Sequence, residues 1–543
     1  MKTLYYIICL FFSLLSSNKC MTQNYKPEWD NVTAKNWPDG FFMAQIVSSA
    51  DGSIQKAICY KSSLKKPQPL IVSLHTWSGD YNQEDPLARE ILLRDWNYIH
   101  PDFRGVNNKP EACGSQYVIS DIEDAINFAV QNFITDSANV HIIGVSGGGY
   151  ATMLAFMKLR FPVKSFNAWV GISNLEEWYY ESVGRQLRYA SDLEGVTTNG
   201  KGFDAVEARR RSPVFMDYQP ELRKNSALNI YTGIHDGYTG SVPITQSTNM
   251  FNKLLKDIYP EKSREVISDS LKLILLEKRM NPGESYGFIG ERLIHLQRIL
   301  PKLSITVFEG GHEMLVTQAL SLLPAGNIQN MKPLNILTIG DSNGASENGW
   351  PVQIKKLLPY STVINKSISG NTIGFDNLGQ EKLNTLKNIE HYLNEANNAL
   401  LSNNTFDFIL IGLGTNDAKK IFERNQKEVT QNLDFLIKKI KDYYIKKEEK
   451  IPTIVIISPP PMEDDKADKI KYEGGNQRIE VNNTKFKKVA GKNEVIFIDI
   501  YQDLKKAGAG ITTDGVHLTE KVQFQIAEKI LMSISGNSSL TIN

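Results

Sequence analysis

The stretch IIGVSGGGYATML (142–154) sets a β-branched run against three glycines, with Ser146 at the junction. This pattern predicts a strand, a sharp turn and a helix, because the residues that flank a serine in so crowded a turn must lack side-chain bulk. We expect the turn to hold the Ser146 hydroxyl clear of the sheet, with the N–H of Gly147 directed at an oxyanion formed on attack. The loop after an early strand, LHTWSG, predicts a second oxyanion donor at Thr76 or Trp77.

A serine hydroxyl is a weak nucleophile and needs a base that an acid orients. The segment TGIHDGYTGSVP supplies Asp236 after one later strand, and FEGGHEML supplies His312 after the next. An acid and then a histidine, each at a strand end, is the order expected for this type of turn. His235 is an alternative base, although its position beside the acid favours local packing.

Short β-rich runs alternate with helical stretches between residues 40 and 320. This alternation predicts a mostly parallel α/β sheet. A helix is predicted at VISDIEDAINFAVQNF (118–133), whose apolar residues recur at spacings of three and four. The predicted strands are PLIVSLHT (69–76), WNYIHPDF (96–103), NVHIIGVS (139–146), SALNIYTG (226–233) and LSITVFEG (303–310).

Four motifs in this part of the chain point to one family: LHTWSGD (74–80), DFRGV (102–106), GVSGGGY (144–150) and RSPV (211–214). Together they resemble the catalytic domain of the prolyl-oligopeptidase-like branch of α/β hydrolases, over about residues 40–320. The resemblance implies an α/β-hydrolase fold and a triad of Ser146, Asp236 and His312. The chain departs from the family pattern by extra residues between Asp236 and Val242 and by the lack of a preceding β-propeller.

A second serine follows a strand-like run in ILTIGDSNGASENGW (336–350). Further blocks follow in order, each near a predicted strand end: NKSISGNTIG, ILIGLGTNDAKK and TTDGVHLTEK. The backbone N–H groups of Ser342 and Gly370 and the Asn416 amide would provide three oxyanion donors. Only three positions separate Asp514 from His517, so one loop can hold the acid against the imidazole and direct it at Ser342.

This ordered set of blocks closely resembles the SGNH (GDSL-type) hydrolase family, across about residues 333–535. The resemblance implies a flavodoxin-like, three-layer α/β/α fold, an exposed site and esterase or acetylhydrolase chemistry. Asn343 stands where many members have a hydrophobic residue after the serine, which predicts a more polar floor of the site.

A chain of 543 residues is too long for one ordinary core. The turn-rich stretch PAGNIQNMKP (324–333) precedes a second α/β alternation, so we place a boundary near residue 330. The expected domains are residues 23–330, an α/β hydrolase, and residues 331–543, an SGNH hydrolase.

Residues 1–22 are expected to be a signal peptide, because Met1-Lys2 precedes the apolar run LYYIICLFFSLL. A buried strand is the alternative. A signal peptide predicts export to the periplasm, the outer membrane or the medium. Cys20 could carry a lipid anchor, but Lys19 stands where a small residue usually precedes a lipidated cysteine. Cys59 and Cys113 could form a disulfide or remain free thiols.

The net charge of +1 predicts no binding of nucleic acid. The eight histidines are scattered, and no CxxC or HExxH motif occurs, so we expect neither a metal nor a cofactor.

Aromatic and basic residues after a predicted strand suggest substrate contacts. In NLEEWYYESVGRQLRY (174–189), Trp178 and Tyr179 could stack on sugar faces, and Arg185 could meet a uronate carboxylate. Core packing and a solvated face are the alternatives. The helical stretch at 248–280 is either a lid beside the site or surface decoration.

Two complete serine sites on one exported chain predict deacylation of an esterified polysaccharide that carries acetyl, feruloyl or other acyl groups. One alternative is a serine peptidase or general esterase in the first domain, fused to an acetylesterase. Another is that one domain is an inactive glycan-binding module.

Overall fold

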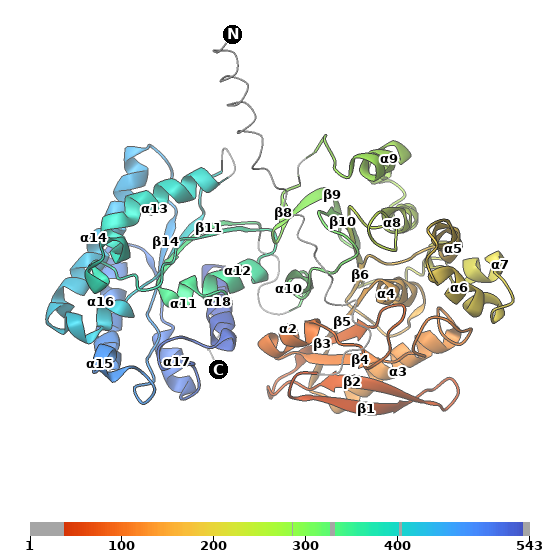
Figure 1. The fold of residues 1–543 in the computed structure, drawn as a ribbon, viewed down its shortest axis with the longest axis horizontal. Coiled ribbons are helices and arrows are strands. Elements are labelled where there is room, and N and C mark those ends of the chain that lie inside the picture. The colour runs from red at the N-terminus through yellow and green to blue at the C-terminus, as the bar shows by residue number, and fades with distance from the viewer. Residues whose placement is uncertain (1–36, 285, 326–331, 401–403, 536–543) are drawn as a thin grey trace, which may run out of the picture.

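The computed structural model describes residues 37–284, 286–325, 332–400 and 404–535. Figure 1 shows two β-sheets side by side, one from each half of the chain, each with helices on both faces. The α/β fold class predicted from the sequence is confirmed. The predicted signal peptide and the predicted boundary near residue 330 lie outside the described residues.

The first sheet has ten strands in the order β1-β2-β4-β3-β5-β6-β7-β10-β9-β8. Its six central strands, from β4 to β10, pair in parallel, and the strands at both edges pair antiparallel. The strands are β1 (Phe41–Val47), β2 (Ile54–Tyr60), β3 (Gln68–Leu74), β4 (Asn97–Pro101), β5 (Thr135–Val145), β6 (Ser165–Trp169), β7 (Ala227–Gly233), β8 (Phe288–Ile289), β9 (Arg292–Leu300) and β10 (Leu303–Phe308).

Every residue of β3, β4, β6 and β10 is buried, as expected for parallel strands covered on both faces. The helices of this half are α2 (Leu87–Arg94), α3 (Gln116–Asn132), α4 (Gly147–Lys158), α5 (Leu175–Gly184), α6 (Tyr189–Thr198), α7 (Ala205–Arg211), α8 (Ile244–Ile258), α9 (Asp269–Lys278) and α10 (Val316–Ala319). The helical stretch at 248–280 is divided between α8 and α9. Helix α8 buries Phe251 and Leu254 in the main core, so it is neither lid nor decoration.

The second sheet has five parallel strands in the order β12-β11-β13-β14-β15. This is the flavodoxin-like order 2-1-3-4-5. The strands are β11 (Asn335–Gly340), β12 (Thr362–Asn365), β13 (Phe408–Gly412), β14 (Thr453–Ile457) and β15 (Ile496–Ile498).

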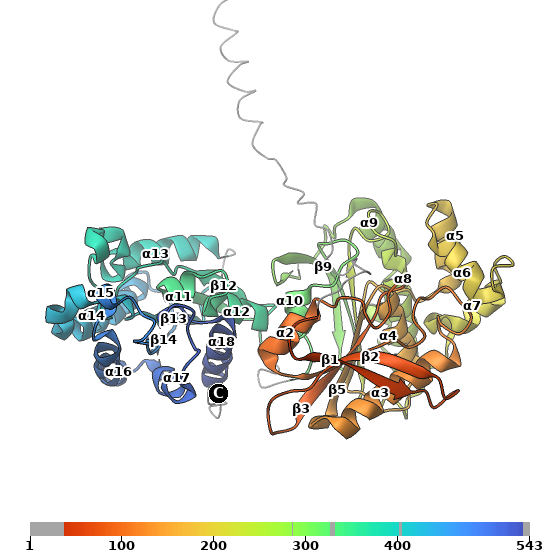
Figure 2. The same cartoon turned by 60° about the horizontal axis from the view of Figure 1, so that its bottom comes forward.

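Adjacent residues of β11 face opposite layers of the second half: Ile336 packs in one hydrophobic cluster and Leu337 in the other. Figure 2 shows the resulting three layers, helix, sheet and helix. The helices are α11 (Ser342–Ala345), α12 (Trp350–Leu357), α13 (Thr385–Ala399), α14 (Gln426–Lys446), α15 (Lys469–Tyr472), α16 (Gly475–Lys492), α17 (Tyr501–Ala507) and α18 (Glu520–Ile534).

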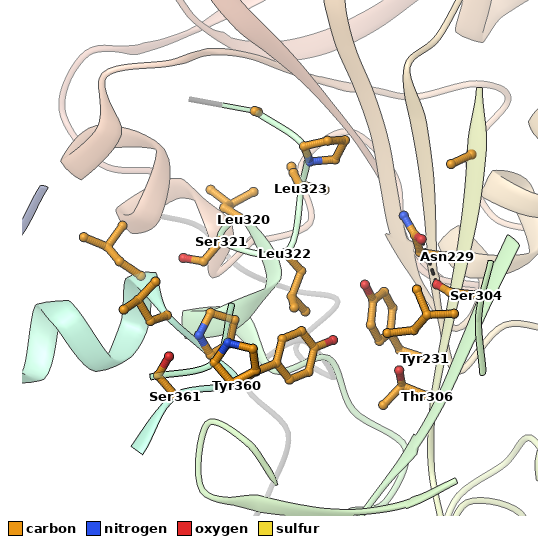
Figure 3. Close-up of a pocket in the computed structure, with 18 of the residues that line it drawn as sticks. Asn229, Tyr231, Ser304, Thr306, Leu320, Ser321, Leu322, Leu323, Tyr360 and Ser361 are labelled. Atoms are coloured by element: carbon orange, nitrogen blue, oxygen red, sulfur yellow. Dashed lines mark hydrogen bonds between the residues drawn. The ribbon is translucent and has the colours of Figure 1, made fainter. Parts of the chain in front are cut away.

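The two halves touch along one junction. The Gly290 N–H donates to the Pro359 carbonyl over 2.6 Å, and the Arg94 guanidinium lies 5.0 Å from the centre of the Phe524 ring. A cavity of about 650 Å³ lies at this junction. Figure 3 shows Tyr231 from β7 and Tyr360, from the segment before β12, lining it from opposite sides. The halves therefore share an interface with polar and aromatic walls.

Cys59 and Cys113 are separate buried thiols rather than a disulfide, and burial raises the pKa of each to about 12. No helix within the described part of the chain is long and apolar enough to cross a membrane.

Candidate active sites

Ser146 lies between the end of β5 and the start of α4, as the sequence predicts for the turn. Its φ of +58° and ψ of −117° are strained for a residue with a side chain. The Ser146 N–H donates to the Trp169 carbonyl on β6 over 2.9 Å, which fixes the turn to the sheet. A Cβ on Gly144 would collide with the Gly148 backbone, and one on Gly148 with the Leu74 carbonyl. The glycines therefore permit the close approach that this turn requires.

The loop after β3 packs directly on the start of α4. A Cβ on Gly147 would collide with the backbone nitrogen of Trp77, so these two peptide groups are neighbours beside Ser146. The Thr76 N–H instead donates to Gln83 Oε1 over 2.8 Å. Of the two alternatives predicted from the sequence, Trp77 is therefore the candidate oxyanion donor. The prediction for Thr76 is corrected, because its N–H already donates to Gln83.

Asp236 and His312 follow the neighbouring parallel strands β7 and β10, and their side chains meet. His312 Nδ1 lies 2.8 Å from Asp236 Oδ2. Asp236 is fully buried, and its Oδ1 accepts from the N–H groups of Gly237 and Val242 at 2.9 and 3.1 Å. His235 pairs instead with Glu309 over 2.7 Å, the local packing expected for it. We refer to Ser146, Asp236 and His312 as site 1.

Residues 237–241, the extra residues by which the chain departs from the family pattern, lie around the Asp236–His312 pair. Arg185 donates to the carbonyls of Gly237, Gly240 and Ser241 at 3.1, 2.9 and 2.7 Å. The Ser241 hydroxyl lies 3.4 Å from His312 Nε2, a contact that no sequence motif predicted. Arg185 therefore supports the acid loop from outside, which corrects its expected role as a uronate contact.

Of the two aromatic substrate contacts expected from the sequence, the structure corrects Trp178. The Trp178 indole is 1% exposed because it packs between Trp77 and Tyr189, and its Nε1 donates to the Ser241 carbonyl over 2.9 Å. The Tyr179 ring stacks on Phe203 with the ring centres 3.7 Å apart. The Trp178 ring is therefore closed to a sugar, and Phe203 covers one face of the Tyr179 ring.

Arg185→Ala is expected to lower the turnover of site 1 about tenfold or more, because displacing a catalytic group by a fraction of an ångström is costly. The rate would be measured in a chain whose second serine is already replaced, by Ser342→Ala. Arg209→Ala is the matched control, since Arg209 forms an exposed ion pair with Glu176 on the same side of the sheet. Equal rates for the Arg185 and Arg209 variants would contradict a supporting role.

The second set of predicted residues forms a continuous relay, which we call site 2. Ser342 Oγ, at the start of α11, lies 2.9 Å from His517 Nε2, and His517 Nδ1 lies 2.6 Å from Asp514 Oδ2. Asp514 Oδ1 also accepts from the N–H groups of Val516 and His517. Partial burial opposes ionisation of Asp514, but hydrogen bonds from the His517 backbone and imidazole and from Val516 outweigh it and lower its pKa.

Gly370 and Asn416 belong to loops that meet at the end of β11. Gly370, with a φ of +90°, lies in a turn closed by the Asn371 N–H and the Ile368 carbonyl. The Ile368 N–H donates to the Gly340 carbonyl over 3.0 Å, two residues before Ser342. Asn416 Nδ2 donates to the Asn371 carbonyl over 3.0 Å. The candidate oxyanion donors of site 2 are therefore brought to one edge of the sheet.

Asn343 does not form a polar floor in site 2, contrary to the expectation from the sequence. Its side chain is 4% exposed and contacts the backbone on both sides of His517.

Asp417, next to Asn416, is a buried acid that sequence patterns did not identify. Burial and the nearby Asp341 raise its pKa to about 7, although the Ile373 N–H donates to both of its oxygens at 3.0 Å. Because the folded state holds the proton more tightly than the unfolded state, the stability that protonated Asp417 provides is lost as pH rises towards 7.

Asp417→Asn should therefore gain stability relative to the unmodified chain, on the order of 2 kcal/mol, when pH rises from 5 to 8. Denaturant unfolding at the two pH values would measure the difference. A difference between the two proteins that stays constant with pH would mean that Asp417 ionises normally.

Comparisons with known protein families find one match in each half of the chain. Residues 93–263 match the model of the prolyl oligopeptidase family, and residues 337–523 match that of the GDSL-like lipase/acylhydrolase family. No curated protein matches the chain significantly.

Several solved structures are similar to parts of the chain. A carbohydrate acetylesterase from Sinorhizobium meliloti is 21% identical, covering 38% of this chain and 99% of that one, with a TM-score of 0.31. An aryl esterase from M. smegmatis is 21% identical, covering 37% and 99%, with a TM-score of 0.31. An acylaminoacyl peptidase from Pyrococcus horikoshii is 21% identical, covering 40% of this chain and 35% of that one, with a TM-score of 0.32.

Two family models thus match two consecutive segments, and each matched segment contains one of the two serines described above. Residues 93–263 are thus similar to the prolyl oligopeptidase family and residues 337–523 to the GDSL-like lipase/acylhydrolase family, and both matches support a serine hydrolase.

Proposed function

We propose that the protein is an exported esterase with two active sites, which removes acyl groups from polysaccharide. The observation that carries the proposal is the unbroken relay of site 2, with contacts of 2.6 and 2.9 Å from Asp514 through His517 to Ser342. The strained turn at Ser146 and the Asp236–His312 pair follow strands β5, β7 and β10 of one parallel sheet, which supports a second site of the same chemistry.

In the proposed mechanism the serine hydroxyl attacks the ester carbonyl while the histidine Nε2 takes its proton. The buried or hydrogen-bonded aspartate holds the histidine tautomer and stabilises the imidazolium. The histidine then gives the proton to the departing sugar hydroxyl, which leaves an acyl-serine. Water, activated by the same histidine, hydrolyses this intermediate and restores the serine.

Backbone and amide N–H groups stabilise the oxyanion in both sites under this proposal. The donors are the N–H groups of Gly147 and Trp77 in site 1. In site 2 they are the N–H groups of Ser342 and Gly370 and the second amide hydrogen of Asn416.

A polysaccharide with more than one type of ester is the proposed substrate, because two acyl-transfer sites on one chain suit a polymer with two kinds of substituent. Acetyl and feruloyl groups are the proposed acyl groups. The match of residues 93–263 to the prolyl oligopeptidase family favours one second candidate, a serine peptidase activity at site 1. The complete relay of site 2 and the Asp236–His312 pair of site 1 weigh against an inactive glycan-binding module.

A comparison of full-length Ser146→Ala and Ser342→Ala chains distinguishes the two-site esterase from a peptidase activity at site 1. Each would be incubated with acetylated xylan, feruloylated arabinoxylan and an N-acetylated peptide anilide, and the carboxylic acids and the arylamine released would be quantified. We expect the two variants to release different esters, or the same ester from different positions. Identical product profiles would contradict complementary esterases, and cleavage of the anilide by Ser342→Ala alone would favour the peptidase.

A further inference from the structure

Asn343 directly follows the proposed nucleophile of site 2, yet its side chain turns away from the substrate side. Its amide is buried and bridges two backbone groups: Nδ2 donates to the Val516 carbonyl over 3.3 Å, and Oδ1 accepts from the Leu518 N–H over 2.9 Å. These two groups flank His517. One side chain thus ties the nucleophile segment to both sides of the histidine.

Asn343 is itself held in place by Gln523 on α18. Gln523 Nε2 donates to the Asn343 carbonyl over 3.1 Å and lies 3.2 Å from its Oδ1. The other end of the Gln523 amide accepts from the Trp350 N–H at the start of α12, over 2.9 Å. Gln523 is 2% exposed, so this arrangement is shielded from water.

The histidine loop is held at two places. Glu463 accepts from the Gly510 and Thr512 N–H groups at 2.7 and 3.0 Å and donates its own N–H to the Gly515 carbonyl over 2.9 Å. These bonds hold the loop to the Glu463 segment, whereas the Asn343 amide holds it to the Ser342 segment.

The side chains of Asp514 and His517 are about half exposed, at 54% and 49%. The hydrogen bonds of Asp514 go to Val516 and His517, within the same loop. Acid and base therefore form one unit, and the distance between this unit and Ser342 depends on what anchors the loop.

We propose that Asn343 is the positioning residue that sets the distance between His517 Nε2 and Ser342 Oγ. The inference rests on the proposed function of site 2, because it concerns the rate of proton transfer there. Asn343 touches neither substrate nor reacting atoms in this account and acts through the loop that it holds.

The proposal has a consequence that simple loss of stability does not share. Without Asn343 the acid–base pair stays intact, so the midpoint of the pH–rate profile remains in place. The misaligned base lowers kcat, whereas KM changes little because substrate contacts are untouched. We expect kcat to fall about 10- to 100-fold, the usual cost of misplacing a catalytic group.

The test uses the full chain carrying Ser146→Ala, so that only site 2 acts, with p-nitrophenyl acetate as the probe. Asn343→Ala would be compared with Asn482→Ala, a matched control on α16. Asn482 is also a buried asparagine, but its amide donates to Gln426, remote from the histidine loop. Titration with a fluorophosphonate to its end point gives the fraction of folded, reactive sites in each variant.

The expected result is complete labelling of both variants, with kcat lowered 10- to 100-fold only in Asn343→Ala and with unchanged KM and pH midpoint. Rates for Asn343→Ala within twofold of the Asn482→Ala rates would overturn the proposal, and so would a loss explained entirely by a lower labelled fraction. If the Ser146→Ala parent hydrolyses the ester no faster than a Ser146→Ala/Ser342→Ala chain, the proposed function of site 2 has failed, and the inference falls with it.

Discussion

His517→Ala is expected to slow ester hydrolysis by site 2 about 10⁴-fold or more, because loss of the base removes nearly all the contribution of a serine triad. The imidazole is the group that connects Ser342 to Asp514, at 2.9 and 2.6 Å. The initial rate on p-nitrophenyl acetate, in a chain that also carries Ser146→Ala, would measure the loss.

His391→Ala provides the control for this prediction. His391 is an exposed histidine on α13 of the same half of the protein, where it pairs with Glu395 at 3.3 Å. Its removal should leave the rate unchanged. A loss below tenfold in His517→Ala would mean that another group serves as the base.

Gly147→Ala is expected to lower the rate of site 1 about 10²- to 10³-fold, the cost of losing one oxyanion donor. The added methyl group would collide with the Trp77 backbone nitrogen, so the neighbouring peptide must move away from its place beside Ser146. Overpacking of this kind should also destabilise the first half by about 1–3 kcal/mol. Ester hydrolysis in a Ser342→Ala background and thermal unfolding would report the two effects separately.

Gly491→Ala makes the same chemical change without the collision. Gly491 lies in α16, and apart from its chain neighbours and the backbone of its own helix no atom lies within 4 Å of a Cβ built on it. This variant should keep its full rate and its stability to within about 0.5 kcal/mol. If Gly147→Ala behaves in the same way, the contact between α4 and the Trp77 loop is not essential to site 1.

Much of the fold was predictable because local sequence patterns determine it. The runs around 69–76 and 303–310 form β3 and β10, since continuous apolar segments suit parallel strands covered on both faces. The glycines after Ser146 indicated the strained turn for a steric reason that the structure confirms. The order of blocks after Ser342 likewise indicated the flavodoxin-like sheet.

The supporting residues were not predictable, because their roles depend on contacts between distant segments. From the sequence, Arg185 looks like a solvent-exposed basic residue. The fold places it against the Asp236 loop, which lies more than 50 residues further along the chain. Asn343 reaches a loop about 170 residues away. The antiparallel strand β9 (Arg292–Leu300), which lies between β10 and β8, was also missed, since its alternation is interrupted by charged residues.

The central claim, that one chain carries two serine-hydrolase sites, is tested most directly by labelling with a fluorophosphonate and locating the labels by mass spectrometry. The intact protein is expected to carry two labels, on Ser146 and Ser342. Ser146→Ala should keep only the label on Ser342, and Ser342→Ala only the label on Ser146. A single label on the intact protein, or a label that persists at a third serine in the double variant, would contradict the account.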